Sequence, residues 1–485
     1  MDNLKYEKLL SPSVMLLNHK VQMPAVNRQS YKLFIDMRQM KSTYLIVLLS
    51  SLIIFSCEKK VDENFVANDS EYIHQSMQKL TDVIVYDIFS PPVASRIYVY
   101  PSIAGYEVLR HQDPEYRTFA GQLNELEAVP TPDTTQPISL PLASVHAFLT
   151  AGKSFIFSED RIDEYQQQLY QDFQEAFPDD MFQNSIAYGE QVAQHILDWA
   201  DKDNYKQSRS FPKFTVNDEL GRWQPTPPDY MDGIEPHWSR IRPLVIDSAD
   251  QFVPAPPTPF SMEEDSPFYQ EVMEVYETGN NLDEEQAEIA SFWDCNPYVS
   301  HHQGHVMFAT KKITPGGHWI GIAKIAAQKS EADLMKTLET YAMTSIALFD
   351  AFISCWDEKY RSSLIRPETI INQHIDEDWM PLLQTPPFPE YTSGHSVISA
   401  SAATALTELY GEPFPFVDST EVAYGLPPRE FESFKAASEE AAISRLYGGI
   451  HYMPAISNGV DQGRKVGGFI LNKIDTRKDG SLADN

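Results

Sequence analysis

Cysteine, positive charge and long apolar runs are all scarce in this 485-residue sequence. Only three cysteines occur, at positions 57, 295 and 355. So few cysteines exclude a disulfide scaffold, and none are spaced as Cys-x2-Cys, which excludes that kind of zinc site. The sequence leaves open whether Cys295 and Cys355 are free or paired.

Basic residues are outnumbered by acidic ones, 38 Lys and Arg against 69 Asp and Glu, which gives a net charge of −31. A chain this acidic repels the phosphate backbone of nucleic acids and the anionic surface of membranes. General nucleic-acid binding is therefore excluded. Any anion site has to be a local concentration of positive charge that works against the field of the whole protein.

The one marked apolar run extends from Tyr44 to Phe55 and is too short to span a bilayer, which takes about 20 residues. Arg38 and Lys41 precede it and Ser56-Cys57 ends it, which is the pattern of an export signal. The terminal cysteine resembles that of a bacterial lipoprotein signal.

We therefore interpret residues 1–36 as an upstream extension and residues 37–57 as a signal peptide, with Cys57 as the lipidated first residue of the mature chain. Cleavage beside Ser56 by an ordinary signal peptidase and a short buried helix are the alternatives. This interpretation predicts an exported, cell-envelope protein, periplasmic or on the outer surface, that contacts the membrane only through its lipid anchor.

Helical spacing of apolar residues dominates the rest of the chain, long strand-like alternation is nearly absent, and no internal repeat is found. Residues 71–110 and 159–203 follow this spacing, separated by a Pro/Thr linker at Pro130–Pro141. Pro225–Pro259 is rich in proline and predicts an extended surface wrap. The pattern predicts an all-α fold of packed helical bundles, with an N-terminal helical part at 58–329 and a C-terminal part at 330–475.

A long helix is predicted from Ser330, with Ser330 and Asp333 as an approximate capping box. Its apolar stripe places Lys359 on the buried face, where a lysine is costly without an anionic partner. Arg366 follows two helical turns later, directly before Pro367, where the helix is expected to stop. Two cations therefore converge at one helix end.

Two further motifs follow. Ser393-Gly394-His395 opens a predicted helix that runs to Tyr410, and free N–H groups at a helix start favour an anion. A second helix, predicted from about Glu430, carries Arg445 at its end, and His451 follows in a turn after two glycines.

Together these motifs read K-x6-R-P, S-G-H and S-R-x5-H, and in this order they resemble the three signatures of the type-2 phosphatidic acid phosphatase and vanadium haloperoxidase superfamily. The resemblance is best over residues 330–468. It is closest to the marine bacterial vanadium-dependent iodoperoxidases, whose pocket aromatics correspond to Tyr298, Trp356 and Phe388. The resemblance implies an all-α fold of two four-helix bundles.

The resemblance also implies vanadate as cofactor and the oxidation of iodide, or bromide, by hydrogen peroxide to hypohalous acid; the organic acceptor stays unknown. His451 would be the ligand to vanadium and His395 the acid–base residue. The oxyanion would be bound by a set that also includes Lys359, which would polarise the peroxide. That set comprises Lys359, Arg366, Ser393, Gly394, His395, Arg445 and His451.

Two departures from the family pattern bear on the chemistry. Thr392 replaces the usual proline before Ser-Gly-His, and Ala455 stands where an Asp often orients the second histidine. A backbone carbonyl is expected to orient His451 instead. We expect the missing Asp to impair a histidine nucleophile more than a metal ligand, which favours vanadate.

Other functions stay open. The main alternative is a soluble acid phosphatase of the same superfamily that forms a phosphohistidine at His451. A non-catalytic envelope lipoprotein with a degenerate anion pocket is another. His301, His302 and His305 lack a third-ligand pattern with acidic partners, so packing or hydrogen bonding near Tyr298 is favoured over metal binding.

Overall fold

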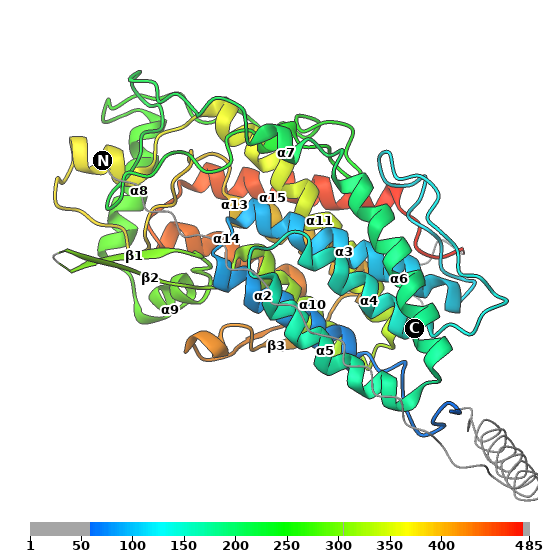
Figure 1. Cartoon of the computed structure of the whole chain (residues 1–485). Coiled ribbons are helices and arrows are strands. Elements are labelled where there is room, and N and C mark those ends of the chain that lie inside the picture. Colours follow the sequence, from blue (N-terminus) through cyan, green and yellow to red (C-terminus); the bar gives the residue numbers. More distant parts are fainter. Residues whose placement is uncertain (1–58, 304, 479–485) are drawn as a thin grey trace, which may run out of the picture. The chain divides into compact units, whose positions relative to one another are not determined.

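Helices make up nearly all regular structure in the computed structural model, which describes residues 59–303 and 305–478 (Figure 1). The predicted extension, the signal peptide and Cys57 lie outside the described residues. No helix of the described part is long and apolar enough to cross a membrane. The all-α class predicted from the sequence is confirmed.

The helices, in chain order, are α2 (Glu71–Asp87), α3 (Pro91–Leu109), α4 (Leu140–Lys153), α5 (Glu159–Ala176), α6 (Asp179–Ala200), α7 (Tyr205–Ser208), α8 (Pro267–Asn280), α9 (Glu284–Phe292), α10 (Pro315–Lys329), α11 (Leu334–Ser362), α12 (Pro367–His374), α13 (Gly394–Tyr410), α14 (Phe434–Tyr447) and α15 (Met453–Lys473). Two antiparallel hairpins interrupt them. These pair β1 (Val299–Gln303) with β2 (Val306–Thr310) and β3 (Phe416–Asp418) with β4 (Arg429–Phe431).

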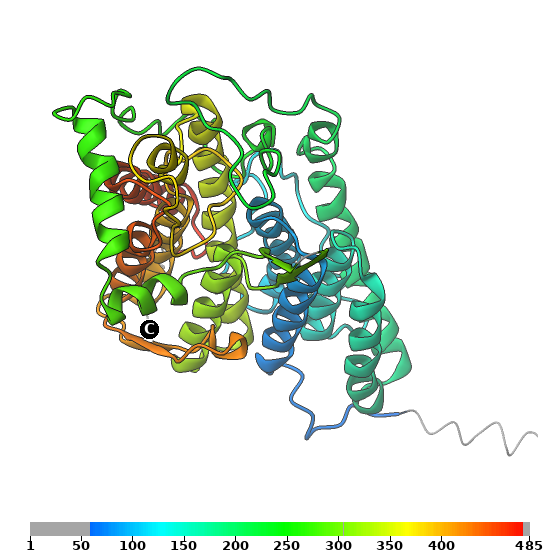
Figure 2. The same ribbon diagram turned by 90° about the vertical axis from the view of Figure 1, so that its left-hand side faces the viewer.

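Helix α11 joins the two groups of helices. It packs extensively against α3, which itself packs on α4 and α6, and on its other side against α13, which packs on α14 and α15. In Figure 2 the blue-to-teal N-terminal helices and the yellow-to-red C-terminal helices lie to either side of it. Of its 29 residues, 24 are buried, because both groups cover it. The division into parts at 58–329 and 330–475 stays a prediction.

A stripe of glycines brings α15 unusually close to α13. Gly459, Gly463 and Gly467 recur every four residues and so share one face of α15. A Cβ atom at Gly463 would lie 2.1 Å from the carbonyl oxygen of Val397 on α13, which no side chain tolerates. The close approach fixes where α13 lies, and with it the Ser393 end of that helix.

Helix boundaries differ from the predictions at three places. Helix α11 begins at Leu334 with Asp333 as its N-cap, while Ser330 ends α10, so the predicted capping box is wrong. The helix also stops at Ser362, because Ser363 takes a left-handed conformation, and Arg366 instead caps α12. The helix predicted from about Glu430 begins later than expected. Residues 429–431 form strand β4 instead, and α14 begins after its N-cap Ser433.

The proline-rich segment 225–259 contains only one short 3-10 turn, which agrees with the extended surface segment predicted there. It is tied down by Asp350 of α11, whose buried carboxylate accepts the backbone N–H groups of Leu244, Val245 and Ile246 at 2.7–2.9 Å. The predicted Pro130–Pro141 linker is irregular up to Leu140, where α4 begins, and Pro141 lies in the first turn of that helix. Proline is favoured there, since no hydrogen bond is lost.

Candidate oxyanion-binding site

Three buried cations, Lys359, Arg366 and Arg445, are the central feature of the site. Their side chains are at most 2% exposed, and within the described residues none of them forms an ion pair with a carboxylate. Burying three positive charges without a carboxylate partner is unfavourable unless other groups or an anion compensate them.

Lys359 lies near the end of α11 and is held by backbone alone. Its Nζ donates to the carbonyl oxygens of Pro389 at 3.1 Å, Glu390 at 3.0 Å and Thr392 at 2.5 Å. Burial, reinforced by Arg366, lowers the pKa of Lys359 to about 7. Carbonyl dipoles therefore compensate its charge only in part, and a nearby anion would favour the protonated amine.

Arg366 reaches two other segments from the start of α12. Its Nε donates to the carbonyl of Phe388 at 2.9 Å, and its Nη1 donates to the carbonyl of Ile450 at 2.8 Å and to Nε2 of His451 at 3.2 Å. Burial lowers the pKa of Arg366 to about 10, so the guanidinium stays charged at neutral pH. Its buried Nη2 has no hydrogen-bond partner.

Arg445 comes from the end of α14 and is positioned by the segment after α9. Its Nη2 donates to the carbonyl of Trp293 at 2.7 Å, and its Nε donates to the hydroxyl of Ser444 at 3.0 Å. Burial lowers the pKa of Arg445 from its ordinary value. The guanidinium lines a cavity of about 480 Å³, so it faces a space that a ligand can enter.

The start of α13 supplies Ser393, Gly394 and His395. Ser393 caps the helix by accepting the Ser396 N–H at 3.3 Å, and its own N–H donates to the carbonyl of Ala455 at 3.0 Å. His395 lines the cavity, and its buried Nε2 has no hydrogen-bond partner. Burial, then Arg445, holds the pKa of His395 well below its usual range, so the ring is neutral near pH 7.

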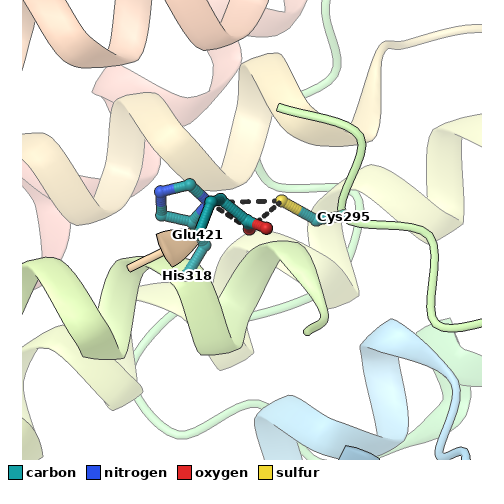
Figure 3. Close-up of side chains that lie close together, drawn as sticks. All are labelled: Cys295, His318 and Glu421. Atoms are coloured by element: carbon teal, nitrogen blue, oxygen red, sulfur yellow. Dashed lines mark hydrogen bonds and ion pairs between the residues drawn. The ribbon is translucent and has the colours of Figure 1, made fainter. Parts of the chain in front are cut away.

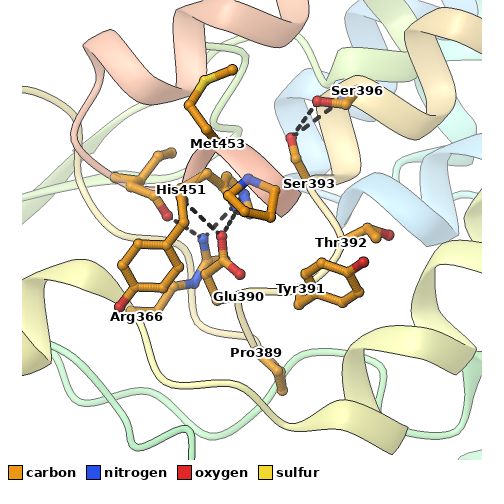
Figure 4. A network of polar contacts seen from close by, with 12 residues as sticks. Arg366, Pro389, Glu390, Tyr391, Thr392, Ser393, Ser396, His451 and Met453 are labelled. Carbon is orange, nitrogen blue, oxygen red and sulfur yellow. Dashed lines mark hydrogen bonds and ion pairs between the residues drawn. The ribbon is translucent and has the colours of Figure 1, made fainter. Parts of the chain in front are cut away.

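Glu390 is the functional residue that the sequence motifs do not contain. Its Oε1 lies 2.7 Å from Nδ1 of His451 and accepts the backbone N–H of Tyr452 at 3.0 Å (Figure 4). The expectation that a backbone carbonyl orients His451 is therefore wrong: the side chain of Glu390, in the segment before Ser393, takes the role that an Asp at position 455 would have. The only signal in the sequence was an acid in an otherwise apolar, proline-rich stretch.

The contacts of His451 fix its tautomer. Burial, then Arg366, holds the pKa of His451 well below its usual range, so its ring is neutral. Because Arg366 can only donate, Nε2 is the acceptor and Nδ1 carries the proton that is donated to Glu390. Nε2 therefore keeps the lone pair that a metal ligand needs. Burial raises the pKa of Glu390 to about 8, although Arg366 and Lys359 oppose this shift.

The three predicted pocket aromatics line the same cavity as His395, Arg445 and His451. Those aromatics are Tyr298, Trp356 and Phe388. The Trp356 and Phe388 rings lie 5.1 Å apart, and Nζ of Lys359 lies 5.0 Å from the Phe388 centroid. An apolar wall beside the cations keeps the local dielectric low and strengthens their attraction for an anion.

The residues present fit a multiply charged oxyanion. The unpartnered Nη2 of Arg366, together with three cations that lack carboxylates, provides a hydrogen-bond donor and charge that such an anion would satisfy, and the unpartnered Nε2 of His395 can accept a proton from it. One neutral imidazole nitrogen is available for a metal centre within the anion. Vanadate would be held by the cations and by His451.

Of the histidines near Tyr298, His301 and His305 do not line the cavity. Nε2 of His301 hydrogen-bonds the Thr310 hydroxyl at 3.0 Å across the β1–β2 hairpin. His305 is exposed. The interpretation of this cluster as packing or hydrogen-bonding residues stays a prediction, and the His302 side chain lies outside the described residues.

Comparisons with known proteins agree with this arrangement. A family model described as the VCPO second helical-bundle domain matches residues 339–480. The crystal structure of a bacterial vanadium-dependent iodoperoxidase is 54% identical, covers 87% of this chain and 100% of its own, and superposes with a TM-score of 0.82. Comparison with curated proteins gives no match.

A more distant similarity concerns the fold. The holo-type crystal structure of a bacterial vanadium-dependent chloroperoxidase is 16% identical, with 84% of this chain and 98% of that chain covered and a TM-score of 0.64. The corresponding apo-type structure gives 16% identity, 80% and 96% coverage, and a TM-score of 0.60.

Removing the Glu390 carboxylate should weaken vanadate binding. We expect Glu390→Ala to raise the vanadate Kd about 10- to 100-fold, the usual effect of losing the group that orients a ligating histidine. Glu390→Gln keeps an oxygen that can accept from Nδ1 and should recover most of the affinity. Vanadium analysis after ultrafiltration measures both. Equal losses in the two variants would contradict an orienting role for Glu390.

The depressed pKa of Lys359 predicts a pH dependence for anion binding. In the free protein the amine is protonated below about pH 7 and neutral above it, so its help in binding an anion is present at low pH and lost as pH rises. We expect the affinity advantage of the unmodified protein over Lys359→Met to fall by about tenfold per pH unit above pH 7.

The measurement is the ratio of the two vanadate dissociation constants between about pH 6 and about pH 9. Protonation of vanadate itself affects both proteins equally and cancels in the ratio. A ratio that stays constant over this range would show that Lys359 does not titrate there.

Proposed function

The chain belongs to the vanadium-dependent haloperoxidase family, and we propose that iodide is the halide that it oxidises with hydrogen peroxide. The observation that carries the proposal is the 54% identity to a bacterial vanadium-dependent iodoperoxidase over 87% of this chain. Bromide is the second candidate substrate. The product is the corresponding hypohalous acid.

Each group of the site has a proposed role. Lys359, Arg366 and Arg445 offset the charge of the bound vanadate, and Ser393 and Gly394 add hydrogen bonds at the start of α13. Nε2 of His451 is the proposed ligand to vanadium. When bound, vanadate supplies a Lewis-acid centre that activates hydrogen peroxide without changing oxidation state.

His395 is the proposed general acid–base residue. Its neutral ring lines the cavity with an unpartnered Nε2, so it can accept a proton from peroxide and return it later. Lys359 is proposed to polarise the peroxide oxygen through its charge, since its three N–H groups already donate to carbonyl oxygens. Tyr298, Trp356 and Phe388 form an apolar wall that limits the water around the reacting groups.

The missing Asp at Ala455 no longer favours vanadate over phosphate, because Glu390 supplies the carboxylate that a histidine nucleophile would also need. The preference for haloperoxidase chemistry therefore rests on the family relationship. The same three cations, Lys359, Arg366 and Arg445, would also bind phosphate. An experiment has to measure both activities.

Vanadate reconstitution of the two histidine variants tests the proposal. We expect iodide oxidation to require both orthovanadate and hydrogen peroxide, and to exceed bromide oxidation. His451→Ala should lose most bound vanadium and nearly all turnover, because it removes the ligating nitrogen. His395→Ala should keep its vanadium and slow by about 10²- to 10⁴-fold, the span of general acid–base help.

Vanadium content and iodide oxidation are measured together on both variants. Loss of vanadium from His395→Ala, with metal and activity retained in His451→Ala, would reverse the two assignments. Phosphomonoester turnover without peroxide, faster than any halide oxidation, would instead identify a phosphatase that uses His451 as nucleophile.

We also infer that the protein is exported and anchored in the cell envelope through a lipid on Cys57. The basic residues and the apolar run before Cys57 support this inference. We expect Cys57→Ser to move the protein from the membrane fraction to the soluble fraction of the producing cells. An unchanged membrane fraction would contradict lipid anchoring at this residue.

A further inference from the structure

A second group of buried side chains lies beside the proposed vanadate site, formed by Cys295, His318 and Glu421 (Figure 3). They come from the loop after α9, from α10 and from the loop after β3. Each is at most 1% exposed. The proposed haloperoxidase function uses none of them.

The three donor atoms converge on one point. The Cys295 sulfur lies 3.3 Å from Nδ1 of His318 and 3.8 Å from Oε1 of Glu421, and these last two atoms are 3.2 Å apart. A tetrahedral zinc ion with bonds of about 2.3 Å to sulfur and about 2.1 Å to nitrogen and oxygen requires separations of about 3.6, 3.6 and 3.4 Å. The observed separations agree to within about 0.3 Å.

Asp418 orients the histidine for such a role. Its Oδ2 lies 2.7 Å from Nε2 of His318, and its Oδ1 accepts the Thr420 N–H at 2.9 Å. The Trp293 ring stacks on the imidazole at 4.5 Å. A carboxylate on the far nitrogen of a histidine is the usual support for a metal ligand, because it directs the other nitrogen toward the ion.

Charge points the same way. Asp418 and Glu421 are both buried, and within the described part of the chain their only ion-pair partner is His318. A divalent cation would offset two of the three negative charges that the two carboxylates and a cysteine thiolate carry. Of the three residues, Cys295 also lines the cavity of the proposed active site, so the cluster lies next to that cavity.

We propose that Cys295, His318 and Glu421 bind a zinc ion that joins these three segments. A sulfur, nitrogen and oxygen donor set disfavours Ca²⁺ and Mg²⁺, which take oxygen ligands, and suits Zn²⁺. The thiol loses its proton on binding, and Nδ1 of His318 provides its lone pair. Since Trp293 lies two residues before Cys295 and its carbonyl holds Arg445, zinc would also fix this part of the vanadate site.

Metal analysis of the purified full chain tests this site. We expect about one zinc per chain after dialysis against a slight excess of zinc followed by metal-free buffer. Cys295→Ser and Glu421→Gln should each reduce the retained zinc at least tenfold, whereas Cys355→Ser should not. Cys355 is the matched control because it is also a buried free cysteine, on α11.

Cobalt gives a second readout that does not need a variant to fold. Cobalt bound to the unmodified protein should show a thiolate-to-metal charge-transfer band, and zinc should abolish it. No such band, or full zinc retention in Cys295→Ser, would overturn the proposal. Zinc content is measured without vanadate or peroxide, so failure here leaves the proposed haloperoxidase function untouched.

Discussion

The site depends on the way two buried cations hold the extended segment from Phe388 to Ser393. Lys359 and Arg366 donate to four carbonyl oxygens of this segment, and hydrogen bonds from a charged donor are worth about 1.5–3 kcal/mol each. The same segment carries Glu390 to His451 and ends at Ser393. The cations therefore both build the anion site and supply its charge.

Much of this arrangement follows from the sequence, because the motif residues sit next to strong local signals. Proline after Arg366, glycine after Ser393 and paired glycines before His451 mark helix boundaries, and a polar side chain of the site lies at or near each boundary. The pattern of buried helix faces likewise predicts Lys359 as a buried cation. These signals are local, so a single sequence contains them.

What the sequence does not reveal depends on contacts between distant residues. Glu390 and His451 are 61 positions apart, and only the folded segment brings them together. The same holds for Cys295, His318 and Glu421. Helix ends were misplaced where two signals competed, as at Ser330 and Asp333. Ser330 is the C-cap of α10, and only Asp333 caps the start of α11.

The burial of α11 has a consequence for the order of folding during synthesis. Helix α3 lies more than 200 positions before α11 in the chain, yet α11 covers one side of α3. Until residues 334–362 have been made, that apolar side has no partner and stays exposed to water. The N-terminal helices cannot complete their core one after another as they emerge. The chain therefore reaches its native core only after most of its length has been synthesised.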